Sequence, residues 1–181
     1  MHEDLKDSGR ESGLPPLLGA SPGVLVLGSF PSRMSLSTGR YYANPRNHFW
    51  SVMRELLSLE GEGIPAWEKG LTDAGIAVWD MIASRRYQQG SMDRDICEEE
   101  VHDLPGFLTT HPTIRCICLN GGKAHESFRR AMRAMPLPSS IRVCPLPSTS
   151  PANARYTLQE KIARWKVLLE YLGQEGMRVS H

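Results

Sequence analysis

The sequence predicts an α/β protein of three layers, in which helices cover both faces of a central four-stranded, mostly parallel sheet. Four short apolar segments, at residues 24–27, 75–79, 114–119 and 141–146, have the length and composition of strands. The first segment has no polar alternation, which is typical of a parallel strand covered on both faces. Strands that alternate with helices favour a parallel sheet enclosed between two helical layers.

Local signals predict the remaining elements. Apolar residues at helical spacing predict helices at 47–59 and 157–172. A short helix is expected at 66–73 and a helix with basic residues at 124–135. Polar stretches are expected to form loops, at 31–50 (overlapping the start of the first helix), 84–90 and 147–154. Residues 95–108 resemble a short helix and connector, and their acidic run at 98–100 is interpreted as a solvated helix face.

Length and charge limit the class of protein. The 181 residues are enough for one domain with a real core, expected at 21–173 between a flexible leader at 1–20 and a flexible tail at 174–181. The net charge of +1 excludes a large basic field, so that any nucleic-acid contact must be a local patch. No apolar run approaches the roughly 20 residues of a membrane helix, and the polar start of the chain is unlike a signal peptide. A cytoplasmic protein with no membrane contact is expected.

The sequence contains none of the common metal or cofactor motifs. The cysteines, Cys97, Cys116, Cys118 and Cys144, form no CxxC pair, so buried free thiols are favoured over an iron–sulfur cluster. The histidines form no HExxH pair. The glycines before Lys123 lack the spacing of a phosphate loop, and no GxSxG is present. No metal and no cofactor are expected.

Polar residues follow the end of every predicted strand. They are the Gly28–Phe30 turn, Asp80, Asn120 and the serine-rich loop at 147–153. Because the carboxyl ends of parallel strands meet at one edge of a sheet, these groups are expected to share a site. The long loop at 31–50 adds tyrosines, amides and arginines, the groups that stack on, pair with and neutralise a nucleotide. The alternatives are an ordinary core strand for 24–27 and a helix-capping loop for 147–153.

Three segments carry a family resemblance. Residues 28–32, 42–50 and 146–154 resemble the uracil-DNA glycosylase superfamily, and their Asn-x-Phe-Trp and Pro-Ser-x-Ser motifs are similar to mismatch-specific thymine/uracil glycosylases. Phe30 stands where that branch has Asn or Asp. Together with Tyr-Tyr-Ala-x-Pro-Arg-Asn, this departure resembles the hypoxanthine-DNA (deoxyinosine) glycosylase branch. The resemblance covers about residues 24–172.

The resemblance implies a monofunctional enzyme of base-excision repair. It would flip a deaminated base out of DNA and hydrolyse its N-glycosidic bond, with hypoxanthine as the expected base and uracil or xanthine as further candidates. Its partner would be DNA that contains such a base, and it would act as a monomer. Because Phe30 cannot hold water, one alternative is a catalytically silent nucleic-acid or nucleotide-binding module. A small-molecule hydrolase on the same sheet is a separate alternative.

The resemblance also implies roles for individual residues. Asn47 matches the catalytic amide and would orient the attacking water, although Asn is equally suited to cap the following helix. Tyr42 matches the aromatic on which the base stacks, with Tyr41 as its competitor. The base-binding set is expected to be Gly28, Ser29, Phe30, Tyr42, Asp80 and Asn120, with the backbone N–H groups of the first two holding the leaving base. The DNA-binding set is expected to be Ser32, Arg46, Ser148, Ser150, Pro151, Ala152 and Asn153, and Arg33, Arg40 and Arg155 would add phosphate charge.

Asp80 departs from the Asn that relatives carry at the matching position. An ionised carboxylate only accepts hydrogen bonds and disfavours an anionic leaving base, whereas a desolvated, neutral Asp80 would also donate. The sequence leaves both states open.

Overall fold

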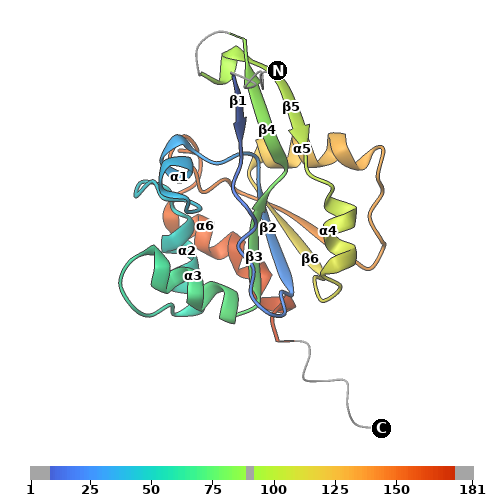
Figure 1. Ribbon diagram of the computed structural model, residues 1–181. Coiled ribbons are helices and arrows are strands. Elements are labelled where there is room, and N and C mark those ends of the chain that lie inside the picture. Colours follow the sequence, from blue (N-terminus) through green and yellow to red (C-terminus); the bar gives the residue numbers. More distant parts are fainter. Residues whose placement is uncertain (1–8, 89–91, 174–181) are drawn as a thin grey trace, which may run out of the picture.

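The computed structural model describes residues 9–88 and 92–173, and it contains the predicted four-stranded sheet (Figure 1). Its strands are β2 (Val24–Gly28), β3 (Ile76–Asp80), β6 (Cys116–Asn120) and β7 (Arg142–Leu146), in the order β3-β2-β6-β7. All three pairings are parallel. The expected mostly parallel sheet is therefore confirmed, and its four carboxyl ends lie at one edge.

Helices cover both faces of this sheet, as the three-layer prediction requires. One face carries α2 (Phe49–Leu57), α3 (Ile64–Asp73) and α6 (Leu158–Trp165), and the other carries α4 (Leu104–Thr110) and α5 (Gly122–Met132) (Figure 1). The expected helix at 157–172 changes after Trp165 into the tighter 3₁₀ turn η2 (Lys166–Tyr171). None of the helices in the described ranges is long and apolar enough to cross a bilayer.

The core is built from the apolar runs that define the strands. The four apolar residues of β2 are fully buried, because helices pack on both sides of them. Phe49 and Trp165 are fully buried as well, and their rings meet edge to face with centroids 6.2 Å apart. This contact joins α2 to α6 underneath the expected site.

A second, antiparallel sheet corrects the prediction for residues 84–108. It contains β1 (Arg10–Ser12), β4 (Ile82–Tyr87) and β5 (Ile96–Val101), in the order β1-β4-β5, with the 3₁₀ turn η1 (Asp93–Asp95) before β5. The expected exposed loop at 84–88 and the helix from 95 were wrong, while residues 89 and 90 of that loop lie outside the described ranges. Charged residues of β4 pair with the acidic run of β5, as Arg85 Nε does with Glu99 Oε1 at 3.1 Å. This pairing lets charged strands form without an apolar pattern.

The leader and the long loop are also more structured than expected. Arg10–Ser12 pairs with β4, and Leu17 exchanges backbone hydrogen bonds with Val78 at 2.8 and 3.0 Å. The predicted loop from residue 31 contains the short helix α1 (Arg33–Thr38), which ends at Gly39 with a positive φ of 68°. Residues 1–8 of the leader and the tail at 174–181 lie outside the described ranges. Of the cysteines, Cys116 and Cys118 are buried as expected, whereas Cys97 is exposed.

Candidate active site

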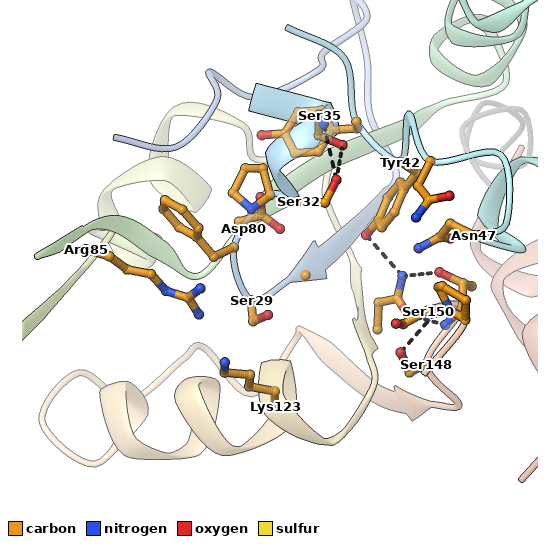
Figure 2. Close-up of a pocket in the computed structure, with 18 residues that line it drawn as sticks. Ser29, Ser32, Ser35, Tyr42, Asn47, Asp80, Arg85, Lys123, Ser148 and Ser150 are labelled. Atoms are coloured by element: carbon orange, nitrogen blue, oxygen red, sulfur yellow. Dashed lines mark hydrogen bonds between the residues drawn. The ribbon is translucent and has the colours of Figure 1, made fainter. Parts of the chain in front are cut away.

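A cavity of about 350 Å³ opens at the carboxyl edge of the parallel sheet (Figure 2). Gly28 and Asp80 are register partners at the ends of β2 and β3, and Asn120 and Leu146 are partners at the ends of β6 and β7. The serine-rich loop that follows β7 forms another part of the rim. The convergence expected from the strand order is therefore present.

Most of the predicted site residues line this cavity. Those that do are Gly28, Ser29, Phe30, Ser32, Tyr42, Asn47, Asp80, Asn120, Ser148, Ser150 and Pro151. The predicted residues outside the lining are Arg46, Ala152 and Asn153. Tyr41, the alternative to Tyr42, also lines the cavity. Six further lining residues were not among the predicted site residues: Pro31, Ser35, Asn44, Arg85, Lys123 and Thr149.

Gly28 makes room for two polar groups of the protein itself. A Cβ at this position would collide with Asp80 Oδ1 and would lie 3.2 Å from the hydroxyl of Tyr42. The sequence suggested that the small residue lets a ligand approach the backbone. In the structure, the Asp80 carboxyl and the Tyr42 hydroxyl, which both line the cavity, lie next to that space.

Asp80 is a buried carboxyl with unused hydrogen-bonding capacity. Asp80 is 5% exposed, and its Oδ2 has no hydrogen-bond partner in the described part of the chain. Burial raises the pKa of Asp80 to about 7, against the opposing effect of the nearby Arg85 charge. A protonated Asp80 is thus accessible at neutral pH, and in that state it both donates and accepts.

Arg85 comes from β4 and was hidden from sequence analysis. Its guanidinium lies 4.5 Å from the centre of the Phe30 ring and its Nε pairs with Glu99. The ring of Phe30 is therefore held against a cation. Only the antiparallel sheet brings Arg85 to the cavity, so no local signal could have found it.

Asn47 is placed where either of its two predicted roles is possible. Its Oδ1 accepts the backbone N–H of Phe49 at 2.9 Å, which ties the side chain to the start of α2. The same side chain lines the cavity beside Tyr42 (Figure 2). One lone pair of the carbonyl oxygen is thus used by a backbone donor, a second stays available to a water, and the amide NH₂ can donate into the cavity.

Asn120 holds the site together rather than offering a free amide. Its Nδ2 donates to the hydroxyl of Tyr42 and to Oγ1 of Thr149, both at 3.0 Å, and its Oδ1 accepts the N–H of Thr149 at 3.0 Å. Both amide protons are used within the protein, so the expected base-binding role would depend on the remaining lone pair of the Asn120 carbonyl. Tyr42 is further fixed by stacking on Phe49, with ring centroids 4.1 Å apart, and its backbone has a positive φ of 53°.

The serine loop after β7 satisfies most of its own backbone. Ser148 Oγ accepts the N–H of Ser150 at 3.1 Å, and Ser150 Oγ accepts the N–H of Ala152 at 3.2 Å. The N–H of Asn153 reaches the Ser150 carbonyl at 3.0 Å. These three N–H groups are therefore already used within the loop, whereas the serine hydroxyls keep a proton to donate.

The positive charges expected to meet phosphate are placed unequally. Arg46 is exposed beside the cavity loop, and Arg155 is exposed with its guanidinium 5.4 Å from the ring of Tyr156. Arg40 instead forms an ion pair with Glu68, which reduces its availability. In the described ranges, no group of three His, Cys, Asp or Glu residues is placed to hold a metal ion.

A three-layer fold with an amide, a buried carboxyl and a tyrosine in one cavity at the parallel-sheet edge has the layout of a base-excising glycosylase. The family model of the uracil DNA glycosylase superfamily matches residues 15–171. The chain belongs to this superfamily.

Individual relatives agree with this assignment. The chain is 32% identical over 164 residues to a hypoxanthine DNA glycosylase of Methanosarcina acetivorans, covering 88% of this chain and 98% of the relative. It is 27% identical over 158 residues to a hypoxanthine DNA glycosylase of Methanosarcina barkeri, covering 86% and 96%. The solution NMR structure of a candidate uracil DNA glycosylase from M. acetivorans matches with a TM-score of 0.73 and 31% identity, covering 88% and 96%.

Proposed function

We propose that this protein is a monofunctional DNA glycosylase that removes hypoxanthine from DNA. Two relatives that it matches over nearly their whole length are hypoxanthine DNA glycosylases. The observation that carries the proposal is the meeting of Asn47, Asp80 and Tyr42 in one cavity at the edge of the parallel sheet. A flipped base would enter this cavity, because chemistry on a base requires its removal from the stack.

The proposed reaction is hydrolysis of the bond between C1′ of the sugar and N9 of the base. The bond breaks with its electron pair moving to the base, and the sugar acquires oxocarbenium character. The oxygen of a water molecule bonds to C1′, and the water loses a proton to solvent. The products are an abasic site and the free base, which takes up one proton at the nitrogen that left.

Protonated Asp80 would assist the departure of the base. Its carboxyl is buried, close to the Tyr42 hydroxyl, and it has a pKa of about 7. A neutral carboxyl can donate a hydrogen bond to an acceptor on hypoxanthine as negative charge builds up there. An ionised Asp80 would instead repel the same charge.

Asn47 would position the attacking water. Because its carbonyl is held by the N–H of Phe49, the direction of its NH₂ group is fixed. That group would donate to one lone pair of the water oxygen and leave another lone pair to attack C1′. Such an arrangement acts through placement rather than basicity, which suits an electrophilic sugar cation.

The loop after β7 would hold the DNA on either side of the flipped nucleotide. The hydroxyls of Ser148 and Ser150 would donate to phosphate oxygens, and the exposed Pro151 and Ala152 would fill the space that the base leaves. Arg46 would add phosphate charge from the neighbouring loop. Action as a monomer in the cytoplasm stays a prediction from the sequence.

A panel of duplexes tests the proposal. Each duplex carries a single inosine, uracil or xanthine, and alkali cuts the strand wherever a base has been removed. The wild-type protein is expected to release hypoxanthine. Asn47→Ala is expected to lose this activity because the water loses its donor. Gln159→Ala is the control for loss of a side-chain amide, because Gln159 is exposed on α6 and does not line the cavity.

A silent binding module is the second candidate, and the environment of Phe30 favours it. This residue occupies the usual water-holding position, has no polar group and lies against Arg85. If every lesion duplex is bound but none is cut, the module is correct and the glycosylase is rejected. Cleavage at uracil without cleavage at inosine would keep the enzyme and reject hypoxanthine as its substrate.

A further inference from the structure

Lys161 is a fully buried lysine in α6 that forms no ion pair within the described ranges. Its residue exposure is 0%. Its Nζ contacts His48 Nδ1 at 3.3 Å and the carbonyl oxygen of Asn153 at 3.2 Å, both neutral acceptors. Burial lowers the pKa of Lys161, as expected for an ammonium withdrawn from water. An ammonium with only neutral partners is an expensive way to fill a core position.

The two partners of Lys161 belong to the two segments that form the cavity rim. His48 directly follows Asn47, and Asn153 closes the serine loop. The segments also touch directly, since the N–H of His48 donates to the carbonyl of Thr149 at 2.9 Å. Lys161 therefore joins the proposed water-positioning corner to the far end of the proposed DNA-binding loop.

A second residue of α6 holds the near end of the same loop. Trp165, one helical turn after Lys161, donates its Nε1 to the carbonyl of Pro147 at 3.0 Å. One face of α6 thus binds a carbonyl at each end of the loop, at Pro147 and at Asn153. The capping box of Thr157 and Glu160 fixes the start of the helix that carries both donors.

The contact with Lys161 also determines the state of His48. An ammonium has three donors and no acceptor, so Nδ1 of His48 must accept. The imidazole is then neutral, with its proton on Nε2. Burial and the charge of Lys161 both lower the pKa of His48, which favours the same neutral form.

The geometry points to Lys161 as a positioning residue for base excision. It holds the corner at Asn47 and His48 at a set distance from the serine loop, so that the attacking water and the phosphate contacts meet the flipped nucleotide together. This inference depends on the glycosylase function proposed above. It explains why an ammonium stands where an apolar side chain would fill the core at lower cost.

The test compares Lys161→Met with Lys166→Met in the 181-residue chain. Methionine keeps the length of the side chain and removes the charge, and Lys166 is an exposed lysine nearby in η2. Single-turnover excision on an inosine duplex and thermal unfolding are measured for both variants. Lys161→Met is expected to remain folded and to excise on the order of 10- to 100-fold more slowly at saturating enzyme. Lys166→Met is expected to stay within about two-fold of wild type, because the exposed charge contacts neither segment.

A second measurement reads the contact without activity. Nitrogen-15 NMR of the wild-type protein is expected to show His48 with an unprotonated Nδ1 and a protonated Nε2. Amide hydrogen exchange in residues 148–153 is expected to be faster in Lys161→Met than in the wild type. A folded Lys161→Met that excises at the wild-type rate would overturn the inference. An unfolded Lys161→Met would overturn it too, because Lys161 would then serve stability. Absence of excision by the wild type rejects the glycosylase itself, and the NMR result still decides whether Lys161 sets the state of His48.

Discussion

Replacement of Asp80 by Asn should change how the stability of the protein depends on pH. The pKa of Asp80 is raised from 3.8 to about 7, so the folded state holds the proton more tightly than the unfolded state does. Ionisation therefore opposes folding. The free energy of unfolding should fall as pH rises from about 4 to about 7, and the penalty should be complete above pH 7.

The shift sets the size of this effect. A difference of about three pKa units corresponds to about 4 kcal/mol in total, of which about 2 kcal/mol falls between pH 5.5 and pH 8. Asn cannot ionise, so Asp80→Asn escapes the penalty. Relative to wild type, the variant should gain about 2 kcal/mol in free energy of unfolding when the pH is raised from 5.5 to 8.

Urea unfolding of both proteins at the two pH values measures this gain. The comparison cancels every other titrating group that the two proteins share. Asp73→Asn serves as the control for loss of an exposed carboxyl, since Asp73 pairs with Lys69 at the surface. If the difference between Asp80→Asn and wild type is the same at both pH values, Asp80 is ionised in the folded protein throughout and the reasoning fails.

Activity should follow the same titration. If protonated Asp80 donates to the leaving base, the single-turnover rate should fall about tenfold per pH unit above pH 7. The Asp80→Asn variant should excise more slowly than wild type, and its rate should not change with pH in this range, because an amide donates at every pH. It should also lose activity on inosine or prefer uracil. A wild-type rate that rises through pH 7, or a lesion preference that Asp80→Asn leaves unchanged, would count against the role given to this carboxyl.

Three further predictions concern the frame of the site. Asn120→Ala loses three hydrogen bonds, so it should lower the free energy of unfolding by about 1–3 kcal/mol and slow excision. A wild-type free energy of unfolding, measured with urea, would contradict this prediction. Gly28→Ala places a methyl group against the Asp80 carboxyl, so it should lower the free energy of unfolding by about 1–3 kcal/mol and abolish excision. The control Gly122→Ala meets nothing within 4 Å and should be nearly neutral, and equal activity of the two variants would contradict this prediction. Thr157→Ala breaks a capping box and should lower the free energy of unfolding by about 0.5–2 kcal/mol, while the folded variant excises as fast as the wild type. A melting temperature equal to that of the wild type would show that the cap contributes nothing to stability.

The strand edge illustrates what could be predicted from residue order. The apolar runs of β2, β3, β6 and β7 are local patterns, and parallel strands must end at the same edge. It follows that Gly28, Asp80 and Asn120 could be assigned to one site before any coordinates were known. Tyr42 and Asn47 were accessible for another reason, since they belong to a motif that the family shares.

The roles within that site were harder to predict. Asn120 lines the cavity, but its amide donates to Tyr42 and Thr149, which are 78 and 29 residues away along the chain. The strands β4 and β5 were missed because their charges pair with one another, so neither strand shows an apolar pattern by itself. Arg85 was consequently absent from the predicted site.

The sequence alone determined the class of this protein: a parallel sheet between helices, with polar residues at the strand ends and the motifs of a base-excising superfamily. Only the tertiary structure decided the chemical state of its groups. The raised pKa of Asp80 and the buried ammonium of Lys161 arise from burial and from neighbours that are distant along the chain. Burial and long-range pairing are properties of the packed molecule, and a linear pattern of residue types contains neither.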